Sequence, residues 1–158
     1  MRIALGSDER SHLTDSVEQE LRRRGFELDL YGPLKGEPLP WPDVAVSVAE
    51  AVASGEADEG VLFCWTGTGV CMAANKVPGV RAALCRDAET ARGARAWNQA
   101  NVLCLSLSAT SQAVAGEILE AWFSASPDPS EEENVSKVKS LDQRYRPAAP
   151  AQREKGKV

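Results

Sequence analysis

The sequence predicts an α/β protein with a three-layer Rossmann-like fold built on a five-stranded parallel sheet. Short apolar runs of strand length alternate with longer segments whose apolar residues recur with helical spacing. Strands linked in this way run parallel, because each right-handed crossover contains a helix. We expect the strand order 2-1-3-4-5, which reverses between the first and third strands. The chain has 158 residues, 43% hydrophobic and 26% charged, which suits a globular protein.

Three strands and two helices are predicted in the first half of the chain. The strands cover residues 2–6, 26–31 and 60–63. Between them, two segments carry a leucine or valine every fourth residue, as on one face of a helix. These positions are Leu13, Val17 and Leu21 in the first helix, and Val44, Val48 and Val52 in the second. Gly25 and Gly55 end the two helices.

The second half repeats this pattern. Strands are predicted at residues 80–85 and 102–105, with helices over residues 70–76 and about 87–97. A last helix of the α/β domain carries Val114, Ile118 and Trp122 on one face. The α/β domain is therefore expected to span residues 1–126.

After Phe123 the composition shifts to Ser, Pro and Glu. Within residues 127–142, a short helix over about residues 131–141 has Val135, Val138 and Leu141 as its apolar positions. The helix is too small to belong inside the sheet, so we expect these side chains to bury against a partner subunit. Residues 143–158 lack the apolar content needed for folding and are predicted to form a disordered tail.

Charge and composition argue against several classes of protein. The net charge is −5 and no basic stripe is present, so nucleic acid is not an expected partner. No apolar run is long enough for a bilayer span, and residues 1–6 are too few for a signal-peptide core, so no membrane partner is expected. The four cysteines form neither a CxxC pair nor a Cys/His set, which favours reduced cytoplasmic thiols and no metal site.

The segment from Cys64 to Lys76 carries the strongest functional signal. Cys64 ends an apolar strand, and Gly67 and Gly69 stand in the turn before a helix. Glycines there let successive backbone N–H groups point to one place, where the helix dipole also favours an anion. Cys64 becomes a nucleophile or base if its pKa falls below about 8.5. The alternative is a cysteine that packs as a small hydrophobic side chain.

Asp8 follows the first strand, and the predicted sheet places Asp8 and Cys64 in one crevice at the reversal of strand order. A carboxylate that holds hydroxyl groups, a thiolate that moves a proton and N–H donors for an enediolate oxygen suit proton transfer on a small polyol. Asp8 has an alternative role as the N-cap of the following helix.

Several segments match one known family in order. They are residues 3–8, 41–43, 52–58, 64–69, 73–85 and 98–103. Together they resemble the family of ribose-5-phosphate isomerase B and galactose-6-phosphate isomerase, and the resemblance covers about residues 1–141. It implies an aldose–ketose isomerase that acts on a sugar or sugar phosphate through a cis-enediolate, without a metal or cofactor.

The resemblance also implies residue roles. The cysteine base falls on Cys64. The oxyanion-binding loop falls on Thr66, Gly67, Thr68 and Gly69, with Thr66 counted as catalytic. Trp41 takes the place of a family tyrosine and counts as substrate-binding. The family is at least dimeric with sites between subunits, so we expect a homodimer or a dimer of dimers in which Asn98 reaches a neighbour's site.

Several residues depart from the family pattern. Glu9 replaces a phosphate-facing histidine, and Trp97 replaces the histidine assigned to ring opening. Arginines are expected at Ser108, Glu133 and Lys137, so Lys137 is the cation of this set that survives. Each charge-assisted hydrogen bond contributes about 1.5–3 kcal/mol, so their loss disfavours ribose 5-phosphate as the substrate. Arg10 or Arg86 would have to restore positive charge from a new direction.

The tryptophans admit two interpretations. Trp65, where the family has glycine, and Trp97 either cover the apolar face of a substrate or fill space left by polar groups. Trp41 and Trp122 have core or interface packing as their simpler role. His12, the single histidine, stands in the first turn of a helix, either solvated or as an acid–base group.

An active isomerase of a substrate other than ribose 5-phosphate is the preferred function, because the proton-transfer set survives. The alternatives are a non-catalytic ligand-binding relative and a subunit that needs a paralogous partner chain.

Overall fold

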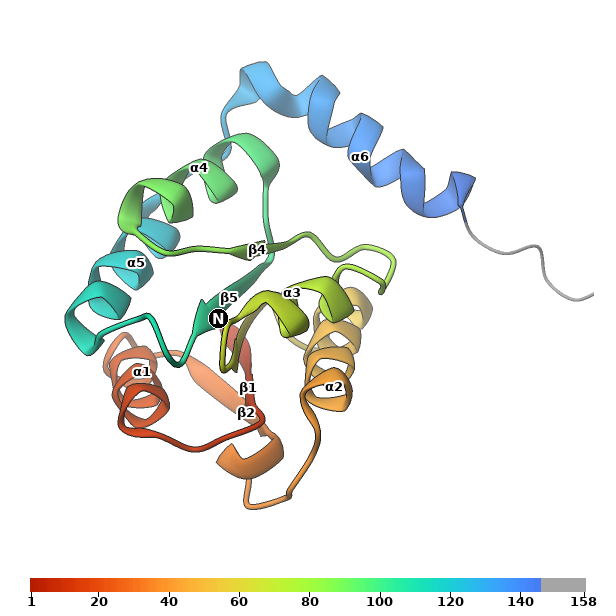
Figure 1. The fold of residues 1–158 in the computed structure, drawn as a ribbon. Helices are drawn as coiled ribbons and strands as arrows, with labels where there is room; N and C mark the ends of the chain where they lie inside the picture. The colour runs from red at the N-terminus through yellow and green to blue at the C-terminus, as the bar shows by residue number, and fades with distance from the viewer. Residues whose placement is uncertain (146–158) are drawn as a thin grey trace, which may run out of the picture.

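The computed structural model describes residues 1–145, which form a five-stranded parallel sheet with helices on both faces (Figure 1). The strands are β1 (Arg2–Ser7), β2 (Glu27–Tyr31), β3 (Glu59–Cys64), β4 (Ala82–Leu84) and β5 (Val102–Ser106). Every pair of neighbouring strands is parallel. The predicted fold class is confirmed.

The strand order is β2-β1-β3-β5-β4, so the predicted order 2-1-3-4-5 was wrong for the last two strands. All residues of β5 are buried, whereas β4 has three residues, each of them partly or largely exposed. A strand covered by helices and flanked by strands on both sides needs a continuous apolar run. The run from Val102 to Ser106 supplies it, and the short Ala82–Leu84 strand is suited to the sheet edge.

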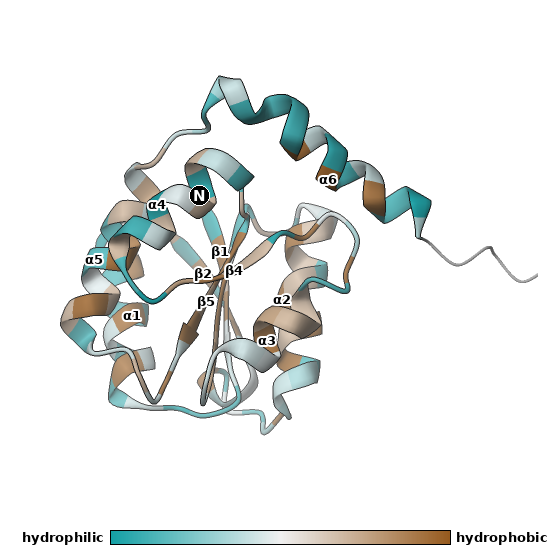
Figure 2. Cartoon of the chain, turned by 45° about the horizontal axis from the view of Figure 1, so that its top comes forward, coloured by the Kyte–Doolittle hydropathy of each residue, from teal (hydrophilic) through white to brown (hydrophobic). Residues whose placement is uncertain are grey.

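Three helices cover one face of the sheet and two cover the other (Figure 1). The first face carries α1 (His12–Arg23), α4 (Ala88–Asn98) and α5 (Gln112–Ser124), and the second carries α2 (Trp41–Ser54) and α3 (Thr68–Ala74). Alternate residues of β1 divide between the two cores, because Ile3 and Leu5 face α1 while Ala4 faces α2. Figure 2 shows the hydrophobic strands enclosed between these layers.

Local sequence sets the helix boundaries. Ser11 caps α1, since its hydroxyl accepts the Thr14 N–H, and Asp87 caps α4 through the Thr90 N–H. Gly55 ends α2 with a φ of 81°, a left-handed conformation that glycine takes at little cost. Trp122 of α5 is wholly buried, as its core interpretation required, and its indole N–H donates to Glu59.

The C-terminal helix α6 (Glu132–Arg144) follows a single 3₁₀ turn, η2 (Pro129–Glu131), and lies outside the two helical layers (Figures 1 and 2). The prediction for Val135 was wrong, because this side chain is 2% exposed and buries against its own chain. Val138 and Leu141 are 51% and 44% exposed. The helix runs to Arg144, so the predicted start of the disordered tail at residue 143 was too early. Residues 146–158, the rest of that predicted tail, lie outside the described part of the chain.

None of the helices in residues 1–145 combines the length and hydropathy required to cross a bilayer.

Candidate functional site

The Cys64 loop, residues 64–69, joins β3 to α3 in a tight turn. The Gly67 N–H donates to the Cys64 carbonyl oxygen at 3.1 Å, and Gly67 has a φ of 73°. A Cβ on Gly67 would lie 2.6 Å from Leu84 Cδ1 and 2.9 Å from the Leu105 carbonyl carbon. Both the backbone angle and the lack of space therefore require glycine. The turn leaves the first N–H groups of α3 without partners inside the helix.

The chain after β5 holds this loop in place. The Leu107 N–H donates to the Cys64 carbonyl oxygen at 3.0 Å. The Ser108 N–H and the Ser106 hydroxyl both donate to the Trp65 carbonyl oxygen, at 3.0 and 2.9 Å. Sequence prediction missed these partners because it placed the last strand away from the third. The available signal was the pair of serines at the carboxyl end of a wholly apolar run.

In the observed strand order, β3 lies between β1 and β5, and the helix that follows β3 packs on the opposite face of the sheet from the helices that follow its two neighbours. These helices are α1 and α5 on one face, and α3 on the other. Neighbouring connections that diverge in this way open a crevice at the carboxyl edge, and ligands bind there in open α/β sheets. Ser7 pairs with Phe63 in the register, so Asp8 and Cys64 leave neighbouring strands at the same level.

Asp8 is free of the capping role that was its alternative interpretation. Ser11 caps α1 instead, and the Ser7 hydroxyl bonds the Glu9 backbone at 2.6 Å. The Asp8 carboxyl is partly buried, and loss of solvent raises its pKa, helped by the neighbouring negative charge of Glu9.

Cys64 is 5% exposed and packs among apolar side chains between β3 and the α2 face. The hydroxyl groups of Thr66 and Thr68 lie 2.7 Å apart on the exposed side of the loop. The Trp41 ring begins α2 and covers Gly69, where a Cβ would approach the ring to 3.1 Å. Trp41 is 41% and Trp65 is 65% exposed, so both indoles remain accessible beside the loop.

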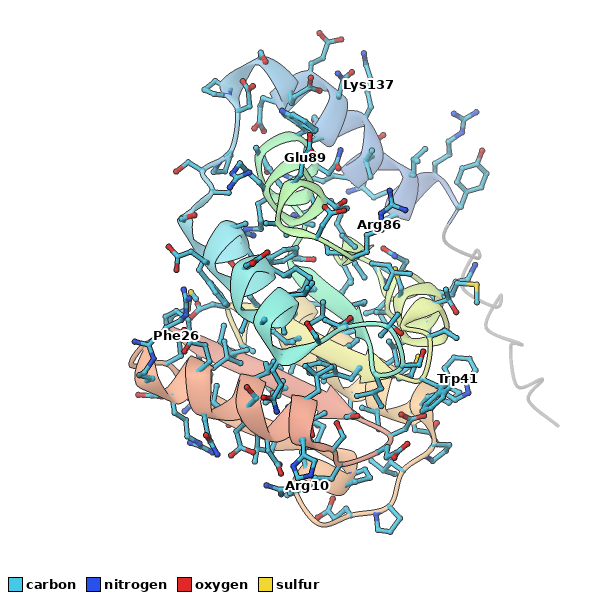
Figure 3. All side chains as sticks on the ribbon, turned by 60° about the vertical axis from the view of Figure 1, so that its left-hand side comes forward. Arg10, Phe26, Trp41, Arg86, Glu89 and Lys137 are labelled. Atoms are coloured by element: carbon cyan, nitrogen blue, oxygen red, sulfur yellow. The ribbon has the colours of Figure 1, made fainter. Side chains whose placement is uncertain are left out.

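The other predicted site residues, Trp97, Asn98 and Lys137, lie at the opposite edge of the sheet. Trp97 and Asn98 end α4, from which the chain returns to the start of β5, and Lys137 belongs to α6. Figure 3 shows Lys137 and Trp41 at separate ends of the molecule. One chain therefore does not bring these three residues to the Cys64 loop.

Trp97 lines the α6 groove, a hollow of about 510 Å³ between α6, α4 and the amino end of β4. Asn98, Val138 and Leu141 also line it. The Trp97 ring lies over Gly93, where a Cβ would approach the ring to 2.7 Å, and the side chain is 55% exposed. Apolar side chains here face solvent within the single chain.

The two arginines that sequence offered as new cations differ in their surroundings. The Arg10 guanidinium lies 2.8 Å from Asp15 and 3.7 Å from Glu18, so two carboxylates already neutralise it. The Arg86 side chain is 91% exposed and lies 3.4 Å from Asp87. Lys137 pairs with Glu133 at 2.6 Å. Through residue 145, no three His, Cys, Asp or Glu side chains are grouped to hold a metal ion.

Comparisons with known proteins agree on one family. The family model described as ribose/galactose isomerase matches residues 3–141. D-erythrulose-4-phosphate isomerase of Pectobacterium atrosepticum is 37% identical over 128 residues, which cover 79% of this chain and 84% of the relative. 4-deoxy-4-sulfo-D-erythrose isomerase of a Clostridium species is 36% identical over 107 residues, 66% of this chain and 67% of the relative. The structure of Clostridium thermocellum ribose-5-phosphate isomerase B superposes with a TM-score of 0.86 at 36% identity, over 92% of this chain and 100% of that one.

Proposed function

The chain belongs to the ribose/galactose isomerase family, and we propose that it is an aldose–ketose isomerase. Its proposed substrate is an open-chain four-carbon sugar with a terminal phosphate. The observation that carries this proposal is the single histidine of the chain, His12, which is exposed at the start of α1. Trp97 occupies the position of the ring-opening histidine, so even a second copy of this chain would not supply that group.

A four-carbon substrate removes the need for ring opening. A furanose forms when the hydroxyl on the fourth carbon attacks the aldehyde, and a phosphate ester on that oxygen prevents the attack. The same reasoning applies to a sulfonate in place of that hydroxyl, as in the name of the Clostridium relative. Two relatives are named for four-carbon substrates of this kind, which need no ring-opening histidine. Their names therefore fit the absence of a histidine at position 97 in this chain.

In the proposed mechanism, the Cys64 thiolate removes the proton from the carbon next to the carbonyl group. The electron pair moves to the carbonyl oxygen and forms a cis-enediolate. The N–H groups of Thr68 and Gly69 stabilise this oxygen, and the Thr66 hydroxyl moves a proton between the two oxygens. Cys64 then returns its proton to the other carbon. Asp8 holds a substrate hydroxyl, Trp41 and Trp65 cover the apolar side of the substrate, and no metal takes part.

We further propose that the working unit is a homodimer or a dimer of dimers in the cytoplasm. The exposed apolar side chains of the α6 groove support an interface there, and Trp97, Asn98 and Lys137 would then come to the Cys64 loop from the neighbour. Four unpaired cysteines suit a reducing compartment. We assign Arg86, an exposed cation that follows β4, to the terminal phosphate.

The purified chain tests this proposal. Erythrose 4-phosphate and ribose 5-phosphate are supplied separately in deuterated water, and deuterium entering the product is measured. We expect turnover of the four-carbon substrate and turnover of ribose 5-phosphate that is slower by orders of magnitude. Efficient isomerisation of ribose 5-phosphate would contradict the proposal, and absence of exchange with every sugar would favour a non-catalytic relative or a missing paralogous partner.

Restoring the missing groups gives a matched control. The double variant Trp97→His and Glu9→His should raise ribose 5-phosphate turnover and leave that of the four-carbon substrate nearly unchanged. Trp97→Phe, which adds no acid–base group, should raise neither. An equal gain in both variants would show that bulk at position 97, rather than the absent imidazole, limits the reaction.

A further inference from the structure

Three of the four cysteines, Cys64, Cys71 and Cys104, belong to the core between the sheet and the α2 and α3 layer, and Cys85 belongs to the core on the other face. Cys64 ends β3, Cys71 lies in α3, Cys85 follows β4 and Cys104 lies in the middle of β5. The proposed isomerisation uses Cys64 alone. Among the other three, Cys85 and Cys104 are buried, and Cys71 is the partly exposed one.

Cys71 lines a hollow between α3 and the end of β4. Thr68, Met72, Lys76 and Leu84 line this hollow together with Cys71. Solutes can therefore approach the sulfur of Cys71 from solvent, whereas Cys104, at 0% exposure, is accessible only through Cys71 or by opening of the fold.

Hydrogen-bond donors converge on the Cys71 sulfur. Cys71 packs against the buried cluster that contains Cys104, and its thiol donates to the Ala82 carbonyl oxygen at 3.4 Å. The Asn75 side-chain amide donates to the Cys71 sulfur at 3.7 Å, and the Cys104 thiol and the Leu84 N–H also stabilise the Cys71 thiolate. The Cys104 bond contributes most, and together the donors lower the pKa of the Cys71 thiol to about 7. Burial acts in the opposite direction: it only partly offsets the donors at Cys71, but it raises the pKa of Cys85 to about 12 and holds that of Cys104 well above its usual value.

Asn75 is itself held firmly in this arrangement. Its amide oxygen accepts the Ala82 N–H at 2.9 Å, and its amide nitrogen donates to the Ala82 carbonyl oxygen at 2.9 Å. The side chain thus pairs with the open edge of β4 as a neighbouring strand would. The donors around Cys71 are consequently in place before any reagent arrives.

We infer that Cys71 and Cys104 form a dithiol that hydrogen peroxide oxidises to a disulfide, with Cys71 as the attacking thiol and Cys104 as the resolving thiol. Two observations carry this inference: Cys71 lines a solvent-facing hollow, and it packs against the buried cluster that contains the Cys104 thiol. It is independent of the proposed isomerase activity.

The reaction balances as two thiols and one peroxide giving one disulfide and two waters. The Cys71 thiolate attacks one peroxide oxygen, the O–O bond breaks, and the leaving hydroxide takes a proton to become water. The sulfur of Cys104 then attacks the sulfenic acid at Cys71. The S–O bond breaks, and the hydroxide leaves as water with the proton of Cys104. Two electrons pass from the thiols to the peroxide.

Peptide mapping of the full chain tests the inference. The reduced protein is treated with hydrogen peroxide, unfolded in an alkylating reagent, digested and examined by mass spectrometry with and without dithiothreitol. We expect a linked peptide pair containing Cys71 and Cys104, reversed by dithiothreitol, with Cys64 and Cys85 alkylated. A disulfide between other cysteines, or sulfinic acid at Cys71 beside an alkylated Cys104, would overturn it.

Two variants and one rate measurement extend the test. Cys104→Ala should stop at a sulfenic acid on Cys71 that dimedone traps, and Cys85→Ala, the matched control, should still form the disulfide. In the unmodified chain, alkylation of Cys71 should rise with pH through a midpoint of about 7. A midpoint of about 8.5, as for a free cysteine, would show that the donors do not act and would overturn the inference even if a variant fails to fold.

Discussion

The Cys64 loop and the α6 groove lie at opposite edges of one sheet, and different interactions form them. Backbone hydrogen bonds from Leu107 and Ser108 fix the Cys64 loop, and Gly67 fits a space that admits no Cβ. The α6 groove instead exposes Trp97, Val138 and Leu141. Its helix is tied to the rest of the chain by bonds such as the 2.7 Å contact from the Gly79 N–H to Asp142.

A single chain is sufficient to form the Cys64 loop, whereas it leaves apolar side chains of the α6 groove exposed to solvent. The Cys64 loop has its backbone donors, its glycines and Asp8 in place within a single subunit. The α6 groove instead holds Trp97 and Asn98 at the edge of the sheet away from Asp8 and Cys64. We therefore expect changes in the first region to act on chemistry and changes in the second to act on assembly.

The largest expected effect follows replacement of Cys64. A positioned base contributes about 10²–10⁴-fold, so Cys64→Ala should lower kcat by that factor. Thermal unfolding should change little, because Ala keeps most of the apolar contact. Cys71→Ala, one helical turn further along, should keep kcat within about tenfold because it removes no proposed base. The reverse ranking in a deuterium-exchange assay would transfer the base to Cys71.

The second effect concerns assembly. Val138→Asp removes an apolar side chain of α6 that is 51% exposed in the single chain. Burial of one valine contributes about 1.5 kcal/mol or more, and a symmetric dimer contains two copies, so dimer affinity should fall by about 10²-fold or more.

Sedimentation measures that affinity, with Ser136→Asp as the matched control. Ser136 lies on the same helix but does not line the α6 groove, so its substitution adds the same charge without touching the proposed interface. A monomer in the unmodified chain at micromolar concentration would refute the interface.

Asp8→Asn should have a smaller effect on catalysis. A charge-assisted hydrogen bond to a substrate hydroxyl contributes about 1.5–3 kcal/mol, so kcat/KM should fall by about 10- to 100-fold. Burial raises the pKa of Asp8, so the ionised form is lost as the pH falls through that raised value, and activity should decline above the usual aspartate range.

The neighbouring carboxylate tests this assignment. Glu9 raises the pKa of Asp8 by charge repulsion, so Glu9→Gln should move the acidic decline to lower pH while leaving activity near neutral pH largely unchanged. Asp8→Asn should abolish the decline. An unchanged acidic limb in both variants would assign it to another group.

The smallest effect compares two left-handed glycines. Gly36→Ala meets nothing within 4 Å at a φ of 90°, so only backbone strain of about 1–2 kcal/mol is expected. Gly67→Ala adds an overlap with the Leu105 backbone, so its free energy of unfolding should fall by about 1 kcal/mol more. Equal losses in denaturant titrations would show that the Cys64 loop adjusts without cost.

Much of the site was predictable because its signals are local. The apolar run before Cys64 and the glycines after it specify a strand, a tight turn and a helix start whatever surrounds them. The positions of Asp8 and Cys64 at strand ends followed in the same way. Ser11, rather than Asp8, proved to be the helix cap. A shift of a few residues in the start of the helix changes which residue caps it, and sequence patterns do not fix helix starts that closely.

The sequence by itself determined the α/β class, the element order and the Cys64 loop, because hydrophobic spacing and glycine conformation act over a few residues. Only the tertiary structure decided that β5 lies between β3 and β4, that Ser106 and Ser108 hold the loop, and that Val135 buries within its own chain. It also placed Trp97 and Asn98 at the far edge of the sheet, and Cys71 against the buried cluster that contains Cys104. These outcomes depend on which segments, distant in the sequence, pack against one another in the core, and local sequence patterns do not determine that packing.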